Sequence, residues 1–115
     1  MKICKEMIKL RKLLTARGIS WQDASVIYPE EKIEMLFKSI GQKLGQERQF
    51  FDLTIYRTHF DINGTHYSAI NGFGTYGGFE PYENKNHGLL ELMIDDNDPV
   101  GWLSADDIIN MINGE

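Results

Sequence analysis

Cysteine is almost absent from this chain of 115 residues, which contains only Cys4. A single thiol cannot form an intramolecular disulfide, and this usage favours a reducing compartment. Long apolar runs are missing as well, because charged residues such as Lys5, Glu6 and Lys9 interrupt the apolar positions near the N-terminus. That interruption excludes the apolar core of a signal peptide and a membrane-spanning helix. The sequence therefore predicts a soluble, cytoplasmic protein.

Basic residues are outnumbered, since 12 Lys and Arg stand against 17 Asp and Glu for a formal net charge of −5, and none lies from Gly88 to the end. A general nucleic-acid binder needs clustered Lys and Arg to neutralise phosphates. The charge therefore disfavours nucleic acid and favours a protein or a small molecule as the partner. The basic residues lean towards the N-terminus, from Lys2 to Arg17. This charge asymmetry either orients a partner or only reflects which faces of the molecule are solvated, and the second interpretation is favoured.

The overall composition is that of a globular protein, with 42% hydrophobic and 25% charged residues. A chain of this length buries enough surface to fold without disulfides. We expect a single domain over residues 1–115.

The strongest local signal in the chain is a β-hairpin. Residues 51–62 and 65–72 lie on either side of Asn63-Gly64 and read as its two strands. Asn and Gly tolerate the positive φ of a type I′ turn, so this dipeptide predicts a two-residue turn. The register that follows pairs Ile62 with Thr65, Asp61 with His66, Phe60 with Tyr67, His59 with Ser68 and Arg57 with Ile70.

Two helices are predicted before the hairpin. Apolar residues at steps of three and four give residues 2–17 one apolar face, and Gly18 supplies the C-terminal stop. The face consists of Ile3, Met7, Leu10 and Leu14. Pro29 then fits the first turn of a second helix, whose core positions are Ile33, Leu36, Phe37, Ile40 and Leu44. Residues 19–26 between them are read as a short strand or an extended linker.

The C-terminal third is predicted to contain two strands and a docked helix. Residues 79–87 are read as an exposed loop, and residues 88–94 as a buried strand, although their composition also suits a helix. Residues 100–103 form a further short strand. Ser104 is the predicted N-cap of the last helix, with Asp107 three residues on as an acidic variant of the capping box. The fold class predicted is α+β, with a mostly antiparallel sheet built around the hairpin and flanked by helices.

One face of the hairpin gathers side chains that could carry chemistry. Alternation places Arg57, His59, Asp61, His66 and Ser68 on the same face. A histidine titrates near neutrality and a neighbouring carboxylate fixes its tautomer, so one interpretation is an acid/base or anion-binding site. The other interpretation is a solvated sheet face, on which the Asp61–His66 pair contributes little to stability. No catalytic residue is assigned, and His59, Asp61, His66 and Arg57 are the candidates if the chain is an enzyme.

A glycine-rich run follows the second strand, and residues 72–77 match G-x-G-x-x-G. The dinucleotide fingerprint must open a helix, whereas this run leads to Glu80-Pro81. The loop amides and the aromatic side chains beside them could instead hold a phosphate, a planar ring or a protein. The predicted binding residues are Phe73, Gly74, Thr75, Tyr76, Gly77 and Tyr82. A bend at the sheet end is the alternative interpretation.

No metal site and no cofactor are predicted. His59, His66 and Asp61 could form a facial triad, but nothing in their spacing selects one. An EF-hand frame starting at Asp96 fails because Val100 stands at a ligand position.

A small acidic chain with several aromatic residues resembles the uncharacterised small proteins carried by phages and other mobile elements of bacteria, which implies a role in binding and modulating a host component. The expected function is a non-enzymatic binding module for a protein or a small molecule, and the same surface could form a homodimer contact. One alternative is a small hydrolase or nuclease-like enzyme. The other is a nucleic-acid-binding regulator with a helix-turn-helix over residues 13–25, which lacks a basic recognition face.

Overall fold

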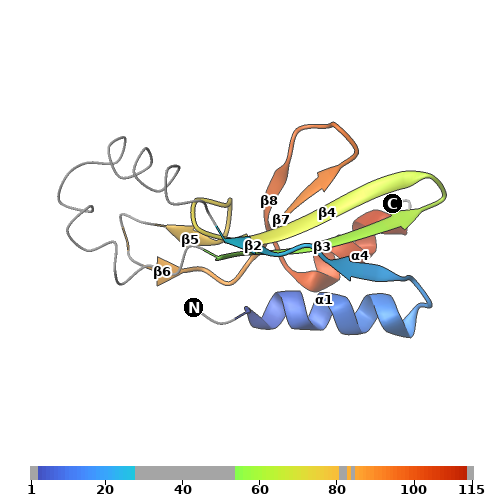
Figure 1. Ribbon diagram of the computed structural model, residues 1–115, viewed down its shortest axis with the longest axis horizontal. Helices are drawn as coiled ribbons and strands as arrows, with labels where there is room; N and C mark the ends of the chain where they lie inside the picture. The colour runs from blue at the N-terminus through green and yellow to red at the C-terminus, as the bar shows by residue number, and fades with distance from the viewer. Residues whose placement is uncertain (1–2, 28–53, 81–82, 84, 114–115) are drawn as a thin grey trace.

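The chain folds into an antiparallel sheet with helices on one side (Figure 1). The structure is a computed structural model and describes residues 3–27, 54–80, 83 and 85–113. Its elements in chain order are α1 (Lys5–Ala16), β1 (Trp21–Asp23), β2 (Val26–Ile27), β3 (Thr54–Ile62), β4 (Thr65–Gly72), β5 (Phe79–Glu80), β6 (Lys85–Asn86), β7 (Leu90–Ile94), β8 (Val100–Leu103) and α4 (Ala105–Ile112). The helix predicted from Pro29 to Leu44, and the first residues of the strand predicted from 51, lie outside the described residues.

The sheet is centred on the predicted hairpin. Its strand order is β1-β3-β4-β7-β8, with β2 also paired to β3, and each of these pairs is antiparallel. Asn63 and Gly64 have φ angles of 51° and 84°, as a type I′ turn requires. The five predicted cross-strand pairs are all present. The α+β fold, with an N-terminal and a C-terminal helix around an antiparallel sheet, is thereby confirmed.

Helix α1 packs the predicted apolar face inward. Met7, Leu10 and Leu14 are fully buried in the main core cluster. Ile3 precedes the helix, which begins at Lys5, and packs against the edge of that cluster. Gly18 has a φ of 73° and ends the helical segment, because a residue without Cβ adopts this conformation without strain.

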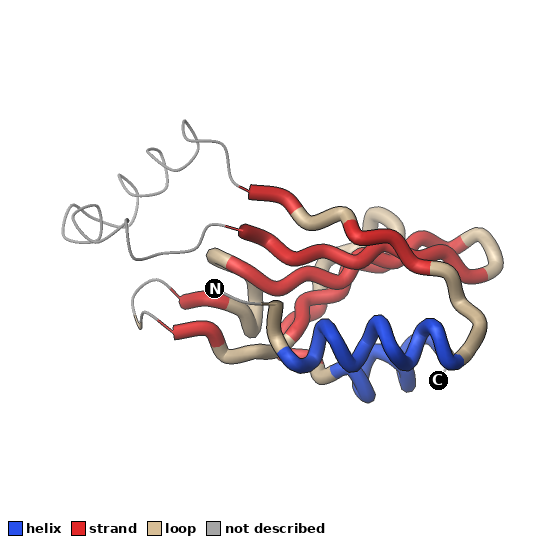
Figure 2. Tube along the Cα trace, turned by 60° about the horizontal axis from the view of Figure 1, so that its bottom comes forward, coloured by secondary structure: helices blue, strands red, loops and turns tan. Residues whose placement is uncertain are grey.

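Helix α4 is docked through its N-terminus. The capping box forms as predicted: the Ser104 side chain accepts a hydrogen bond from the Asp107 amide, and the Asp107 side chain accepts one from the Ser104 amide. The Ala105 amide donates to the Glu6 carboxylate of α1 at 2.8 Å. These bonds satisfy amides that a helix start leaves without partners, and the bond to Glu6 connects α4 to α1. Figure 2 shows the two helices side by side.

Two segments follow one of the alternatives predicted for them, and a third differs from its prediction. Residues 19–26 contain the short strand β1 and the first residue of β2, so the second helix of a helix-turn-helix is not formed there. Residues 79–87 are not simply an exposed loop, because β5 and β6 pair and Phe79 is buried. The apolar segment 88–94 forms a strand, β7, rather than a helix. Pairing with β4 and β8 selects the strand, as tertiary context overrides propensity.

Among the described residues, no helix is long and apolar enough to cross a membrane.

Candidate functional site

The face of the sheet turned away from the helices carries the predicted polar cluster. Residues at alternate positions of β3 and β4 share this face, and it continues onto β7 because Ser68 pairs with Met93 and Ile70 with Glu91. The side chains form three cross-strand rows: Arg57, Ile70 and Glu91; His59, Ser68 and Met93; Asp61, His66 and Asp95. We call this surface the open face.

The two histidines of the open face lie next to each other. Their ring centroids are 4.9 Å apart in an edge-to-face arrangement. His66 Nδ1 lies 2.7 Å from Asp61 Oδ1, so the carboxylate fixes the orientation of that ring. The side chains of His66 and Asp61 are 46% and 70% exposed. Water screens such a pair, which therefore contributes little to stability.

Burial lowers the pKa of His59, and the charges of His66 and Arg57 lower it further, while Asp61 opposes the shift. Burial and like charges both disfavour the imidazolium form. His59 is therefore held neutral at pH 7. Arg57 is the cation close to His59 on the open face. Its guanidinium has no hydrogen-bond or ion-pair partner among the described residues.

A groove of about 380 Å³ runs over the open face. It is lined by Arg57, His59, His66, Ser68, Ile70, Glu91, Met93, Asp95 and Asp96. The structure thus brings together three of the four candidate catalytic residues in one groove, with Asp61 at its margin beside His66. The carboxylates of its far wall follow from the pairing of β4 with β7, which the sequence analysis did not anticipate.

The glycine-rich loop is fixed against the β7–β8 hairpin. The Tyr76 amide donates to Glu91 Oε1 at 2.9 Å, and the Tyr76 carbonyl accepts from the Trp102 amide at 3.2 Å. The Gly77 carbonyl accepts from the Leu89 amide at 2.9 Å. Gly77 has a φ of 93°, and a Cβ there would lie 3.0 Å from the Trp102 nitrogen. The loop therefore needs glycine at this position to approach β8 so closely.

The predicted binding residues of this loop divide into buried and exposed ones. Phe73 is 3% exposed and stacks on Phe79, with ring centroids 5.8 Å apart, so it supports the loop from beneath. The Thr75 hydroxyl is bonded to the backbone of Gly72. Gly74 is exposed, Gly77 is buried, and Tyr76 is 61% exposed. Tyr82 lies outside the described residues.

Trp102 is a surface residue that sequence reasoning missed. Its side chain is 56% exposed and lies beside the His87 ring at a centroid distance of 5.0 Å. The backbone of Trp102 has a φ of 59°, and the pairing of β7 with β8 is irregular between Leu90 and Leu92. A bulge re-aims the side chain it carries. The available signal was Gly101, where a Cβ would collide with Tyr76.

The hollow under the glycine-rich loop is small. It measures about 120 Å³ and is lined by loop residues together with His87 and Trp102. Pockets for organic ligands usually measure about 300–1,000 Å³. The hollow that the described residues form at this loop is therefore smaller than a usual ligand pocket.

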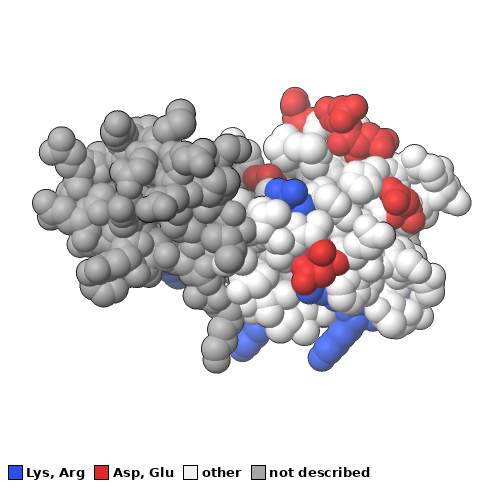
Figure 3. All heavy atoms as spheres, in the orientation of Figure 1, with Lys and Arg blue, Asp and Glu red and all other residues white. Residues whose placement is uncertain are grey.

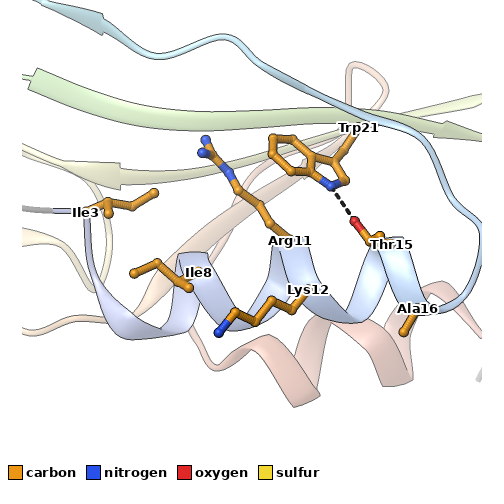
Figure 4. A pocket seen from close by; sticks show the side chains of 7 residues that line it. All are labelled: Ile3, Ile8, Arg11, Lys12, Thr15, Ala16 and Trp21. Atoms are coloured by element: carbon orange, nitrogen blue, oxygen red, sulfur yellow. Dashed lines mark hydrogen bonds between the residues drawn. The ribbon is translucent and has the colours of Figure 1, made fainter.

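Another hollow, of about 570 Å³, lies along α1 beside β1 (Figure 4). Arg11 lines this hollow, and its guanidinium already has partners: it donates hydrogen bonds to Thr58 and Asp23 and lies over the Trp21 ring. Trp21 in turn donates to Thr15 at 2.9 Å. Arg11, Trp21 and Thr15 of this wall thus have structural partners.

Charge is distributed unevenly over the molecule. In Figure 3 acidic side chains gather at the top, over the turn between β7 and β8, whereas basic ones lie at the bottom, near α1, and also in the upper middle of this face. The turn contains Asp95, Asp96 and Asp98, all exposed.

Within the described part of the chain, no group of three or more His, Cys, Asp or Glu residues is arranged to hold a metal ion. Burial raises the pKa of the Cys4 thiol, which keeps it protonated and weakly nucleophilic.

Comparison with protein-family models, with curated proteins and with solved structures finds no match to this chain. The fold and the site geometry therefore carry the functional argument.

Proposed function

We propose that this chain is a non-enzymatic binding module that engages a protein partner through Tyr76 and Trp102. The observation that carries the proposal is the exposure of these two large aromatic side chains on backbone segments that hydrogen bonds hold together. Tyrosine and tryptophan dominate the binding energy of protein interfaces. A surface that is already ordered loses less conformational entropy when a partner binds.

The conformation of Trp102 supports the same proposal. A positive φ is unfavourable for a residue with a side chain, and such conformations cluster at functional positions. Packing does not require the indole, because more than half of its surface is in water. A role in recognition gives a reason for a tryptophan at a strained, exposed position.

The partner we propose is a protein with a basic surface around an apolar patch. The acidic turn of Asp95, Asp96 and Asp98 belongs to the same β7–β8 hairpin as Trp102. Complementary charge steers a partner toward an interface and raises its association rate. A second copy of the chain carries the same net charge of −5, so a different protein is favoured over a homodimer.

The alternative functions have less support. A hydrolase would use His59, Asp61, His66 and Arg57. The side chains of His66 and Asp61 are 46% and 70% exposed to water, which weakens electrostatic stabilisation of a transition state. A nucleic-acid-binding regulator is disfavoured by the formal net charge of −5, and residues 21–23 form a strand where its motif needs a second helix. A cytoplasmic location and a role as a phage or mobile-element modulator belong to our proposal and rest on the sequence alone.

The test is affinity capture by the immobilised full chain from an extract of its host, read by quantitative mass spectrometry. The variant Tyr76→Ser/Trp102→Ser should lose a captured protein at least tenfold, because interface aromatics contribute about 2 kcal/mol or more. Ile8→Ala, which trims an exposed apolar side chain on α1, is the matched control and should retain it. Undiminished capture by the folded double variant, or no protein retained by the wild type, would overturn the proposal.

A further inference from the structure

The groove on the open face is distinct from the exposed aromatic pair in its chemistry. Its volume of about 380 Å³ falls within the range of small-molecule sites. Its floor combines two apolar side chains, Ile70 and Met93, with the hydroxyl of Ser68. These residues occupy adjacent positions on β4 and β7. The groove can therefore contact a short apolar body along its length.

The charges of this groove are separated between its two walls. On the β3 side stands Arg57, whose guanidinium has no partner among the described residues. On the β7 side stand Glu91, Asp95 and Asp96. One oxygen of Glu91 accepts from the Tyr76 amide and one of Asp95 accepts from the His66 amide, while Asp96 forms no such bond within the described residues. Asp61, which is on β3 itself, is paired with His66.

We propose that this groove binds a small zwitterion, with its anionic group at Arg57, its ammonium group at the β7 carboxylates and a short alkyl chain between them. A ligand with only an anion would face three carboxylates, and a ligand with only a cation would leave the guanidinium unpaired. A dipolar ligand can pair its anionic group with Arg57 and its cationic group with the carboxylates of the other wall, which makes the charges complementary. This inference does not depend on the protein partner proposed above.

The span between the walls sets the size of the ligand. Strands β3 and β7 are separated by β4, so their backbones lie about 10 Å apart. Arg57 and Glu91 both have long side chains, and both line the groove, so the charged groups of a ligand can be closer together than the two backbones. A chain of about five methylene groups between a carboxylate and an ammonium fits this arrangement, and 6-aminohexanoate is the matching probe.

The test is a titration of the full-length chain at pH 7.5, followed by two-dimensional amide NMR. Three probes of similar length separate the contributions: 6-aminohexanoate carries both charges, hexanoate only the anion and hexylamine only the cation. We expect 6-aminohexanoate to perturb the amides of Ser68, Ile70 and Met93 and to bind at least tenfold more tightly than either other probe. Equal affinities, or no perturbation of these amides up to about 50 mM, would overturn the inference.

Charge variants assign the two ends of the ligand. Arg57→Gln should abolish the preference for 6-aminohexanoate over hexylamine, and Asp96→Asn should reduce the preference over hexanoate about threefold, because two carboxylates remain. Lys12→Gln and Asp98→Asn change the net charge equally but lie outside the groove, and they should leave both preferences unchanged. Equal effects of groove and control variants would reduce the binding to net charge and contradict the inference.

Discussion

The two faces of the same sheet are built from alternate residues of the same strands, yet they differ in almost every physical property. On the helix side, Thr58, Phe60, Ala69, Leu90 and Leu92 are buried against α1 and α4. On the open face, their immediate neighbours in sequence include Arg57, His59, Ser68, Glu91 and Met93, which line a groove. Strand periodicity alone separates these two sets.

This contrast shows which residues the fold requires. The helix side must fill its volume at the density of a protein interior, so it constrains side-chain size and polarity. The open face has no such requirement, and a cluster of Arg, His and carboxylates there is not explained by packing. Function is therefore to be sought among the residues that the core does not use.

The contrast is tested most directly by two adjacent residues of β7. Leu92 is fully buried in the core, whereas Met93 is 39% exposed. We expect Leu92→Ala to lower the free energy of unfolding by about 2–5 kcal/mol, because it removes buried methyl groups and leaves a cavity. Met93→Ala should change it by about 0.5 kcal/mol or less.

Urea denaturation followed by circular dichroism measures both variants. Similar losses for Leu92→Ala and Met93→Ala would mean that the open face is also a packed surface. In that case the groove would not be an available binding site.

A second comparison concerns the loop that borders the open face. Gly74 and Gly77 both have positive φ, but a Cβ at Gly74 meets nothing within 4 Å, whereas one at Gly77 meets the backbone of Trp102 at 3.0 Å. Gly74→Ala should cost about 1–2 kcal/mol from backbone strain alone. Gly77→Ala should cost about 1–3 kcal/mol more, because the added methyl group overpacks the contact.

Thermal unfolding gives the stabilities, and tryptophan fluorescence in a Trp21→Phe background reports on Trp102 alone. A changed emission of Trp102 should accompany Gly77→Ala but not Gly74→Ala. If the two alanine variants behave alike, the loop is not fixed against β8 as described.

The hairpin and the capped helix could be predicted because their signals are local. Asn63-Gly64 sets the turn, and with it the register that brings Asp61 to His66. Ser104 and Asp107 satisfy the first amides of α4 within a single turn of helix. In each case the partners lie a few residues apart, so the sequence contains the whole interaction.

The far wall of the groove and the exposed tryptophan could not be predicted in this way. Glu91 reaches the open face because β7 pairs with β4, after an intervening loop and the β5–β6 pair. Trp102 lies at an irregular pairing and has a positive φ, and the neighbouring Gly101 was its one local signal. Phe73 was predicted as a binding residue of the glycine-rich run, and the structure places its side chain 3% exposed and stacked on Phe79, a contact that local sequence does not reveal.

The smallest expected effect concerns the protonation of His59. Its pKa is lowered in the folded protein by burial, by His66 and by Arg57, so the unfolded chain binds a proton more readily. The contribution of His59 to the free energy of unfolding should therefore be fully present above the ordinary histidine pKa of about 6.5, and it should be lost as the pH falls through the lower pKa of the folded state.

Imidazole NMR titration should place the titration midpoint of His59 below that of a histidine peptide, and Arg57→Gln should raise this midpoint. His59→Gln should remove this part of the pH dependence from denaturation curves recorded between pH values of about 7.5 and 5. A midpoint of His59 at or above the peptide value would show that the open face leaves this side chain as solvated as an unfolded one, and the difference between the two faces would then be one of packing alone.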